Sequence, residues 1–439
     1  MDGLKRLVTL FVHWSFCSAD RLGYDTSMTR VPNTDTWEIE CADHNASGKS
    51  AKVSKYITTT TIMNASALLG RHTRCYRAVR KGSRGGEEVV IKDSWSLPRD
   101  PKDESTAVDA PDETQNLILI REKLENETID FVYPRVVCGG SVKLRVGNNY
   151  VTDDTANVYE YDGSEKQELF RVHRRIVMAP VGRHIHSVEK EAELVLVLAD
   201  AMKCHNTILT KCELLHRDIS INNILVIRDG ESTRRPVKGL LIDFDHAISV
   251  KQESSGNAAR SGTLPFMSIH NLEQDRSRRT ALDDWESLLY LVCWLGTFGI
   301  NSADSSDVKK HESKEISSWR CGDMQDIAKK KRTQMDSLEL FKKTILVGFQ
   351  DRYVQLKRLA VRIYHALFQH EGCEGASRDI QDLDIVDNSF ESEMDELLEP
   401  VIEESIIRNL LAIIEGRSKI AEEYLERKVV KDSNETAHV

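Results

Sequence analysis

Apolar residues in this chain fall into short runs with the length of strands and longer runs with the spacing of helices. Residues 132–137 and 170–178 are short runs rich in β-branched side chains, so each predicts a strand. Residues 224–227 and 239–242 form another pair of short runs, and Asp229-Gly230 between them is a turn signal. This second pair predicts a β-hairpin.

Helical spacing predicts the longer elements. In the helix predicted at about 113–126, Leu117, Ile120 and Leu124 fall on one face. The predicted helices lie at about residues 113–126, 188–210, 283–295, 322–369 with breaks, and 390–428.

The first residues allow two interpretations. Lys5 and Arg6 precede the apolar residues 7–12, which resembles the front of a secretory signal, although polar residues soon interrupt the run. The same apolar residues have helical spacing, so we favour an amphipathic helix packed on the rest of the chain. Further on, the alternation of residues 37–41 predicts an edge strand.

Composition narrows the class of protein. The chain has 439 residues, enough for a large core, and a formal net charge of −10, which argues against broad electrostatic binding of nucleic acid. Its 9 cysteines form no C-x-x-C pair, so neither a zinc site nor a disulfide framework is predicted. No run reaches the ~18 apolar residues of a membrane span. We therefore expect reduced thiols, no membrane partner and an intracellular location, cytoplasmic or nuclear.

The chemistry is concentrated around the predicted hairpin. His216-Arg217-Asp218 and Asn223 follow the pattern H-R-D-x-x-x-x-N of a kinase catalytic loop, and the second strand of the hairpin ends at Asp243. Phosphoryl transfer requires a base for the hydroxyl proton and ligands for Mg²⁺. Asp218 would be the base, and Asn223 and Asp243 the metal ligands. The alternative is a buried polar loop beside two strands.

A second group of candidates lies nearer the N-terminus. The strand-like residues 88–92 end at Lys92, which matches the lysine that pairs with ATP phosphates in kinases; an exposed strand lysine is the alternative. Gly70 matches the first glycine of a phosphate-covering G-x-G-x-x-G loop and His72 takes the place of the second, although a plain hairpin explains this stretch equally well. Glu113 and Glu122 both remain candidates for the glutamate that would pair with Lys92.

Together these motifs resemble the fungal-type protein kinase-like family, a branch of the protein kinase-like superfamily. The matching stretches are residues 69–73, 90–95, 173–178, 215–225, 242–245, 262–267 and 283–294. The resemblance implies an α+β, bilobal protein-kinase-like fold with a small β-rich N-lobe and a larger helical C-lobe. It also implies ATP as phosphate donor and Mg²⁺ as metal. The domain boundaries that we expect are a leader at 1–56, an N-lobe at 57–182, a C-lobe at 183–430 and a polar tail at 431–439.

The resemblance also assigns roles to single residues. Gly70 and Lys92 would hold the phosphates, while Arg217 and Asp284 would hold the catalytic loop around Asp218. Simple helix capping is the alternative for Asp283 and Asp284. An arginine beside the catalytic aspartate often goes with control by phosphorylation of the activation loop. The candidate sites for such control are Ser254, Ser255, Ser261 and Thr263, the last of which we expect to be structural.

Four departures from kinase patterns keep other functions open. His72 replaces a glycine, Ser220 replaces the lysine of Ser/Thr kinases, Asp245 replaces the glycine of D-F-G, and residues 268–270 replace A-P-E. The leading hypothesis is an ATP-dependent serine/threonine-type protein kinase with a protein substrate. The alternatives are a small-molecule kinase of the aminoglycoside or choline kinase type and a pseudokinase scaffold that binds protein partners. The oligomeric state is not predicted.

Overall fold

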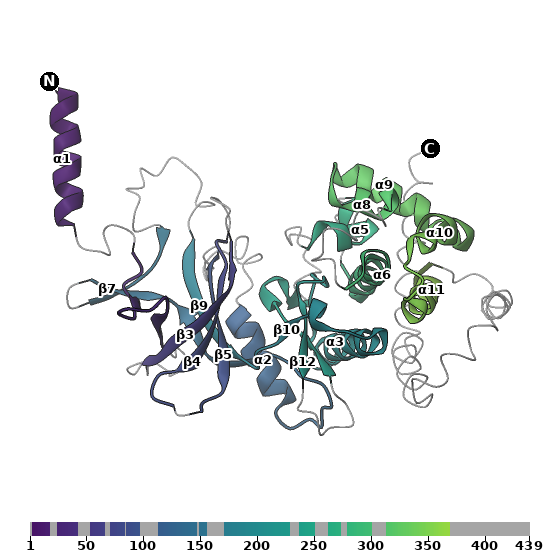
Figure 1. Cartoon of the computed structure of the whole chain (residues 1–439), viewed down its shortest axis with the longest axis horizontal. Coiled ribbons are helices and arrows are strands. Elements are labelled where there is room, and N and C mark those ends of the chain that lie inside the picture. The colour runs from purple at the N-terminus through teal and green to yellow at the C-terminus, as the bar shows by residue number, and fades with distance from the viewer. Residues whose placement is uncertain are drawn as a thin grey trace. The chain divides into compact units, whose positions relative to one another are not determined.

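The computed structural model describes twelve ranges of the chain, and all structural statements below concern them. They are residues 2–17, 24–42, 53–65, 71–83, 85–96, 113–146, 149–155, 171–228, 237–250, 262–273, 279–300 and 313–368. The chain divides into two compact units (Figure 1). The first comprises Met1–Ile118 and Pro134–Val181, and the second comprises Leu119–Tyr133 and Gly182–Val439. The predicted helix at 390–428 and the turn at Asp229-Gly230 lie outside the described residues.

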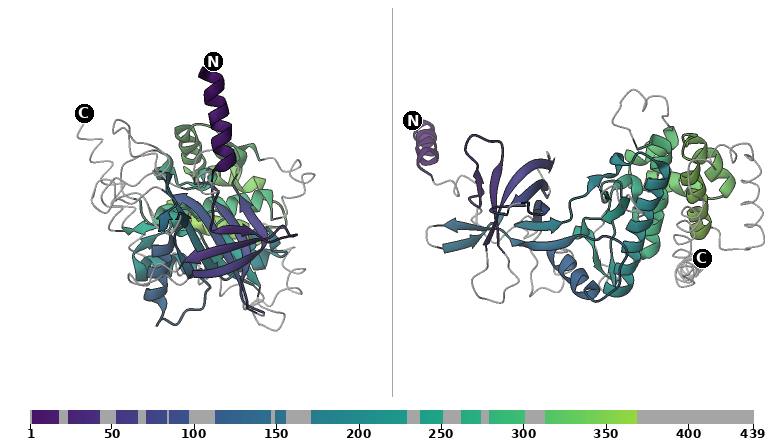
Figure 2. Two further views of the ribbon diagram at one scale, coloured as in Figure 1. Left: turned by 90° about the vertical axis from the view of Figure 1, so that its left-hand side faces the viewer. Right: turned by 60° about the horizontal axis from the view of Figure 1, so that its bottom comes forward.

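The first unit is built on one large antiparallel sheet, whose twist is visible in Figure 2. Its seven strands lie in the order β1-β2-β3-β4-β5-β9-β6. Their bounds are β1 (Met28–Arg30), β2 (Trp37–Ala42), β3 (Val53–Asn64), β4 (Arg74–Arg80), β5 (Glu88–Ser96), β9 (Val172–Ala179) and β6 (Arg135–Ser141). A separate hairpin pairs β7 (Lys143–Val146) with β8 (Asn149–Thr152). The predicted strand at 170–178 is thus confirmed as β9, and that at 132–137 is displaced to β6.

The leader contributes to this sheet. Ile39 on β2 packs in the buried core with Tyr56, Ile91 and Val177, because alternate side chains of each strand point to one face. The expectation of an edge strand at 37–41 is wrong, since β2 pairs with β1 on one side and β3 on the other.

Helix α1 (Asp2–Phe16) forms where helical spacing predicts it, but it does not pack as expected. Its apolar side chains, including Leu7, Phe11 and Trp14, are exposed within the described part of the structure. Helical periodicity therefore identified the element, while the expectation that its apolar face is covered is wrong for the described residues.

Helix α2 (Glu113–Leu124) begins in the first unit and ends in the second. Leu117, Ile120 and Leu124 are buried, as their common face predicts. The helix opens on Glu113, which is also buried.

The second unit is mainly helical, with a small sheet. Strands β10 (Arg183–His184), β12 (Ile224–Arg228) and β13 (Val237–Leu241) form this sheet, so the predicted hairpin is confirmed. A two-residue pair joins β11 (Leu214–Leu215) to β14 (Ile248–Ser249). The helices are α3 (Glu191–Cys212), α5 (Ile269–Leu272), α6 (Ala281–Phe298), α8 (Lys314–Ser317), α9 (Met324–Met335), α10 (Leu338–Thr344) and α11 (Val354–Phe368), and the short 3-10 helices are η3 (Ile185–Ser187), η4 (Phe244–His246), η5 (Leu264–Phe266), η6 (Ser318–Arg320) and η7 (Leu346–Gly348).

Helix α3 supports the hairpin from one side. The two backbones approach so closely that a Cβ at Gly239 would lie 2.1 Å from the carbonyl oxygen of Val197, which is why this strand position is glycine. The buried carboxylate of Asp200 accepts a hydrogen bond of 3.0 Å from the Gly239 N–H. Strand β13 is thereby fixed just before the chain reaches Asp243.

Helix α6 carries a second set of buried polar groups. Its first turn carries a capping box. The Thr280 side chain accepts the backbone N–H of Asp283, and the Asp283 carboxylate accepts the backbone N–H of Thr280. Helix α6 packs beside α11 (Figure 1), and Gly296 near its other end leaves room for the ring of Phe349, which follows η7.

Candidate active site

The catalytic loop is tied to the chain before Asp243 through His216. Its Nε2–H donates to the carbonyl of Ile242 at 3.0 Å, and its Nδ1 accepts the N–H of Asp218 at 3.3 Å. Burial lowers the pKa of His216, against the opposing charges of Asp284 and Asp218, so the ring is neutral. These two bonds fix its tautomer, and the ring packs edge-on against Phe244 at 4.8 Å between centroids.

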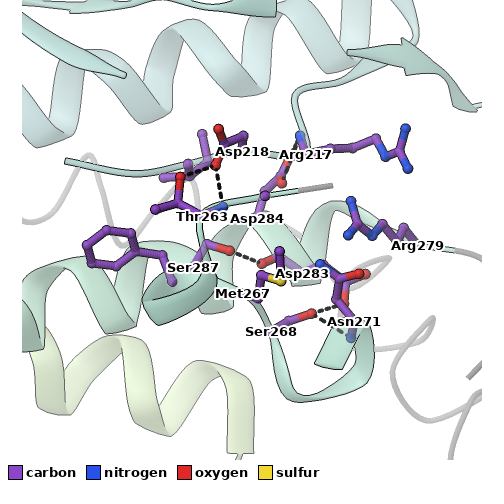
Figure 3. A pocket seen from close by; sticks show the side chains of 13 residues that line it. Arg217, Asp218, Thr263, Met267, Ser268, Asn271, Arg279, Asp283, Asp284 and Ser287 are labelled. Carbon is purple, nitrogen blue, oxygen red and sulfur yellow. Dashed lines mark hydrogen bonds between the residues drawn. The ribbon is translucent and has the colours of Figure 1, made fainter. Parts of the chain in front are cut away.

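Asp218 is held by hydrogen bonds on both carboxylate oxygens. Oδ1 accepts the backbone N–H and the hydroxyl of Thr263, each at 2.8 Å (Figure 3). Oδ2 accepts the amide nitrogen of Asn223 at 2.9 Å. Burial raises the pKa of Asp218, helped by the Asp243 carboxylate and opposed by the bonds from Thr263. A fixed carboxylate with a raised pKa is suited to accept a proton.

Asn223 combines two roles. Its side-chain amide nitrogen also donates to the backbone carbonyl of Asp218 at 2.9 Å. Its backbone carbonyl accepts the N–H of Ile242 at 2.9 Å. The amide nitrogen is committed to Asp218, so the amide oxygen is the atom that suits a cation. Together with the carboxylate of Asp243 it would offer two hard oxygen donors, the type that Mg²⁺ prefers.

Two residues of this region have strained backbone. Arg217 has φ 70° and Asp243 has φ 67°, a left-handed conformation that side chains other than glycine rarely adopt. Such strain persists only where surrounding contacts enforce it, and it gathers at functional sites. Arg217 directly precedes Asp218 in the sequence, and Asp243 follows shortly after the end of β13.

Asp284 braces the strained loop, as the resemblance implied. The backbone N–H of Arg217 donates to both of its carboxylate oxygens, at 3.1 and 3.3 Å, and His205 Nε2 lies 2.7 Å from Oδ2. Burial pushes the pKa of Asp284 upward, but the bonds and charges of His205, His216 and Arg217 outweigh it and hold that pKa below its usual value. Capping, the alternative role, belongs to Asp283 instead.

Lys92 and Glu113 form a buried ion pair in the first unit. Their Nζ and Oε2 atoms lie 2.8 Å apart, and their side chains are 7% and 6% exposed. The alternative of an exposed strand lysine is therefore wrong. Of the two glutamates that the sequence left open, Glu113 is the partner, because Glu122 is exposed.

The stretch matched to the glycine-rich loop is described only in part. Gly70 lies outside the described residues. His72 has φ 47°, the left-handed backbone that glycine adopts without strain, at the place where the kinase pattern has its second glycine. The carbonyl of Arg71 accepts the N–H of Trp95 at 2.7 Å, which ties this stretch to β5.

The chain after Gly262 faces Asp218 and lines a small pocket (Figure 3). Arg217, Asp218, Thr263, Met267 and Arg279 are among the residues around it. Thr263 lies in this stretch and donates its N–H and hydroxyl to Asp218. The other three candidate phosphorylation sites, Ser254, Ser255 and Ser261, lie outside the described residues.

The region that lacks the A-P-E glutamate is held by other groups. Glu286 accepts the N–H of Ile269 at 2.7 Å, and Asp283 accepts the hydroxyl of Ser268 at 2.7 Å. Both acids lie on α6, so this helix connects the chain after Thr263 with Asp284 and the catalytic loop.

One buried network was missed at the level of sequence. Arg175 on β9 is 2% exposed and forms a bidentate pair with Asp93, at 2.7 and 2.9 Å. The same guanidinium donates to Asp25 and Ser27, each at 2.7 Å, and to the carbonyl of Glu40 at 2.8 Å. The available signal was the charge of Arg175 and Asp93 within otherwise buried strands, which requires a partner.

Three features described above are typical of a kinase. They are the catalytic loop, the strained Asp243 and the buried pair of Lys92 and Glu113. The model of the fungal protein kinase family matches residues 2–296, more than half of the chain, and the chain belongs to that family. A comparison with curated proteins gives no match. None of the described helices is both long enough and apolar enough to cross a membrane.

Proposed function

We propose that this chain is an ATP- and Mg²⁺-dependent phosphotransferase of bilobal kinase fold that acts on serine or threonine hydroxyls of a protein substrate. The observation that carries the proposal is the setting of Asp218. Its carboxylate is fixed by Thr263 and Asn223, while Asp243 stands at the end of the adjoining strand. This is the arrangement that phosphoryl transfer requires, with a base next to oxygen ligands for a metal.

Each side chain has a defined part in the proposed reaction. Asp218 orients the acceptor hydroxyl and takes its proton as the oxygen attacks the γ-phosphorus and the bond to ADP breaks. Asn223 and Asp243 would hold Mg²⁺, which would supply positive charge against the phosphates. Lys92 supplies positive charge to the phosphates and is kept in position by Glu113.

Two positions bear on the choice of acceptor. Ser220, where Ser/Thr kinases carry lysine, is fully buried in the catalytic loop, so the second unit supplies no lysine there for the γ-phosphate. Asp245 follows Phe244 in η4, where D-F-G has glycine. We retain a protein acceptor because the family is that of protein kinases and because Thr263 links the chain after Gly262 to Asp218.

A scaffold without catalysis is the second candidate. It is favoured by His72, whose side chain stands where glycine lets backbone approach phosphate closely. Nucleotide binding separates the two candidates, since a scaffold would bind ATP without transfer or would not bind it at all.

The test uses labelled ATP and Mg²⁺ with the purified full chain, alone and with casein as a generic acceptor. The variants are Asp218→Asn, Asp243→Asn and, as a matched control, Asp326→Asn on an exposed face of α9. We expect label on protein with the wild type and the control, and a loss of about 10³-fold with the other two, as for removal of a central catalytic group. Thermal stabilisation by ATP and Mg²⁺ without any transfer would favour the scaffold and overturn the proposal.

A further inference from the structure

Lys331 on α9 is a charged residue without any exposed surface. Its relative exposure is 0%, whereas the neighbouring Lys329 and Lys330 are exposed. Lysine is almost never fully buried unless its ammonium group has partners. The groups that receive Lys331 should therefore show what it does.

The partners of Lys331 are aromatic rings and backbone carbonyls. Its Nζ lies 3.7 Å from the centroid of the Tyr290 ring and 5.1 Å from that of Trp319, so the amino group lies beside two aromatic rings. The same atom donates to the carbonyl of Pro265 at 2.8 Å and to that of Met267 at 2.7 Å. Glu286 and Cys293, both on α6, are the titratable groups whose charges act on it.

Those two carbonyls belong to the short stretch that reaches Asp218. Pro265 lies in η5, and Met267 caps it. The stretch begins at Thr263, whose N–H and hydroxyl both bond Asp218, and the N–H of Phe266 returns to the Thr263 carbonyl at 2.8 Å. One end of this turn thus bonds Asp218 and the other end bonds Lys331.

We propose that Lys331 is a positioning residue for phosphoryl transfer, which holds the turn at Leu264–Phe266 so that Thr263 stays against Asp218. The proposal rests on the function proposed above. It accounts for the missing A-P-E glutamate, because the amino group of Lys331 on α9 and the acids of α6 anchor the chain at this place. Lys331 does not touch substrate and acts through the carbonyls of Pro265 and Met267.

The test compares Lys331→Met, Lys331→Arg and the control Lys330→Met in the full chain. Methionine has a similar volume but donates nothing to the carbonyls, whereas arginine keeps N–H donors. We expect Lys331→Met to lower kcat for transfer to casein by about ten-fold or more, with the KM for ATP within about two-fold of wild type. Lys331→Arg should recover most of the rate, and Lys330→Met should match the wild type.

A second readout does not depend on activity. Amide hydrogen exchange of the peptide that covers residues 262–268 should become faster in Lys331→Met and stay unchanged in Lys330→Met, because the turn loses its anchor. If Lys331→Met does not fold, Lys331→Gln takes its place, since it is neutral and shorter.

The outcomes separate the two claims. Normal kcat and unchanged exchange in Lys331→Met, or a Lys331→Arg variant as slow as Lys331→Met, would overturn the positioning role while leaving the proposed function standing. Absence of transfer by the wild type would overturn the proposed function, and the exchange result would then decide alone whether Lys331 holds the turn.

Discussion

Thr263 donates both its backbone N–H and its hydroxyl to one oxygen of Asp218, Oδ1, at 2.8 Å each. The two residues are 45 positions apart in the chain, so this pair of hydrogen bonds joins the catalytic loop to the stretch that begins at Gly262. A threonine in this setting orients the carboxylate and also lowers its pKa, against the effect of burial.

The hydroxyl of Thr263 should therefore matter for rate. We expect Thr263→Val, which has nearly the same shape, to lower kcat by about ten-fold, the cost of one hydrogen bond to a charged group. Thr263→Ser keeps the hydroxyl and should stay within a few-fold of wild type. Steady-state transfer assays measure both. A valine variant at the wild-type rate would show that the hydroxyl does not help to orient Asp218.

The buried pair of Lys92 and Glu113 gives a prediction on stability and activity together. Glu113→Gln removes the carboxylate charge that lies 2.8 Å from the Lys92 ammonium, so we expect a loss of about 3 kcal/mol in the free energy of unfolding and most of the activity. The double variant Lys92→Met with Glu113→Leu should recover stability but not activity, because an apolar pair fills the site without binding phosphate.

Urea unfolding and transfer assays check this, with Glu122→Gln as the control on the exposed face of the same helix. Equal effects of Glu113→Gln and Glu122→Gln on activity would contradict the assignment of Glu113 as the partner of Lys92.

The network around Arg175 makes a prediction about the leader. Deletion of residues 2–17 removes only α1, whose apolar side chains are exposed, and should leave the melting temperature nearly unchanged. Deletion of residues 2–42 removes β1, β2 and the partners Asp25 and Ser27, which leaves Arg175 short of acceptors in a buried site. We expect that truncation to lower stability by several kcal/mol, about the cost of breaking a buried ion pair. Calorimetry distinguishes the two, and a stable 2–42 deletion would show that the leader is dispensable for the sheet.

The environment of Lys331 predicts how stability depends on pH. Burial, only partly opposed by the charges of Glu286 and Cys293, lowers the pKa of Lys331 from its ordinary value of 10.5 to about 7. Between these two pH values the unfolded chain binds a proton at Lys331 that the folded chain does not bind. The free energy of unfolding should therefore rise with pH across this window, by roughly 1 kcal/mol per pH unit from this one group.

Lys331→Met isolates that contribution, because methionine does not titrate. The difference in unfolding free energy between wild type and Lys331→Met should increase in favour of the wild type between about pH 7 and pH 10. Urea titrations across this range measure it. A difference that stays constant with pH would mean that Lys331 titrates alike in the folded and unfolded chain.

Periodicity and motif spacing predicted much of this molecule. The hairpin of β12 and β13, the long helix α3 and the opening of α6 lie within a few residues of their predicted places, because each is encoded in contiguous residues. Asp218 and Asn223 could be recognised for the same reason, since they lie five positions apart in one loop.

What sequence reasoning missed depends on contacts between distant parts of the chain. Arg175 bonds Asp25 across 150 positions, and Lys331 bonds Pro265 across 66. No local pattern shows which strand or helix will come to lie beside such a residue. The same limit left Glu113 and Glu122 undecided, because both have plausible spacing and only the fold buries one of them beside Lys92.

The central claim is that Asp218 is the base of a phosphotransferase, and the most direct test separates nucleotide binding from transfer. In Asp218→Asn, stabilisation by ATP and Mg²⁺ should equal that of the wild type, because Asp218 is not assigned to hold phosphate or metal. Transfer of labelled phosphate to casein should fall by about 10³-fold. Transfer by Asp218→Asn at the wild-type rate would contradict the account.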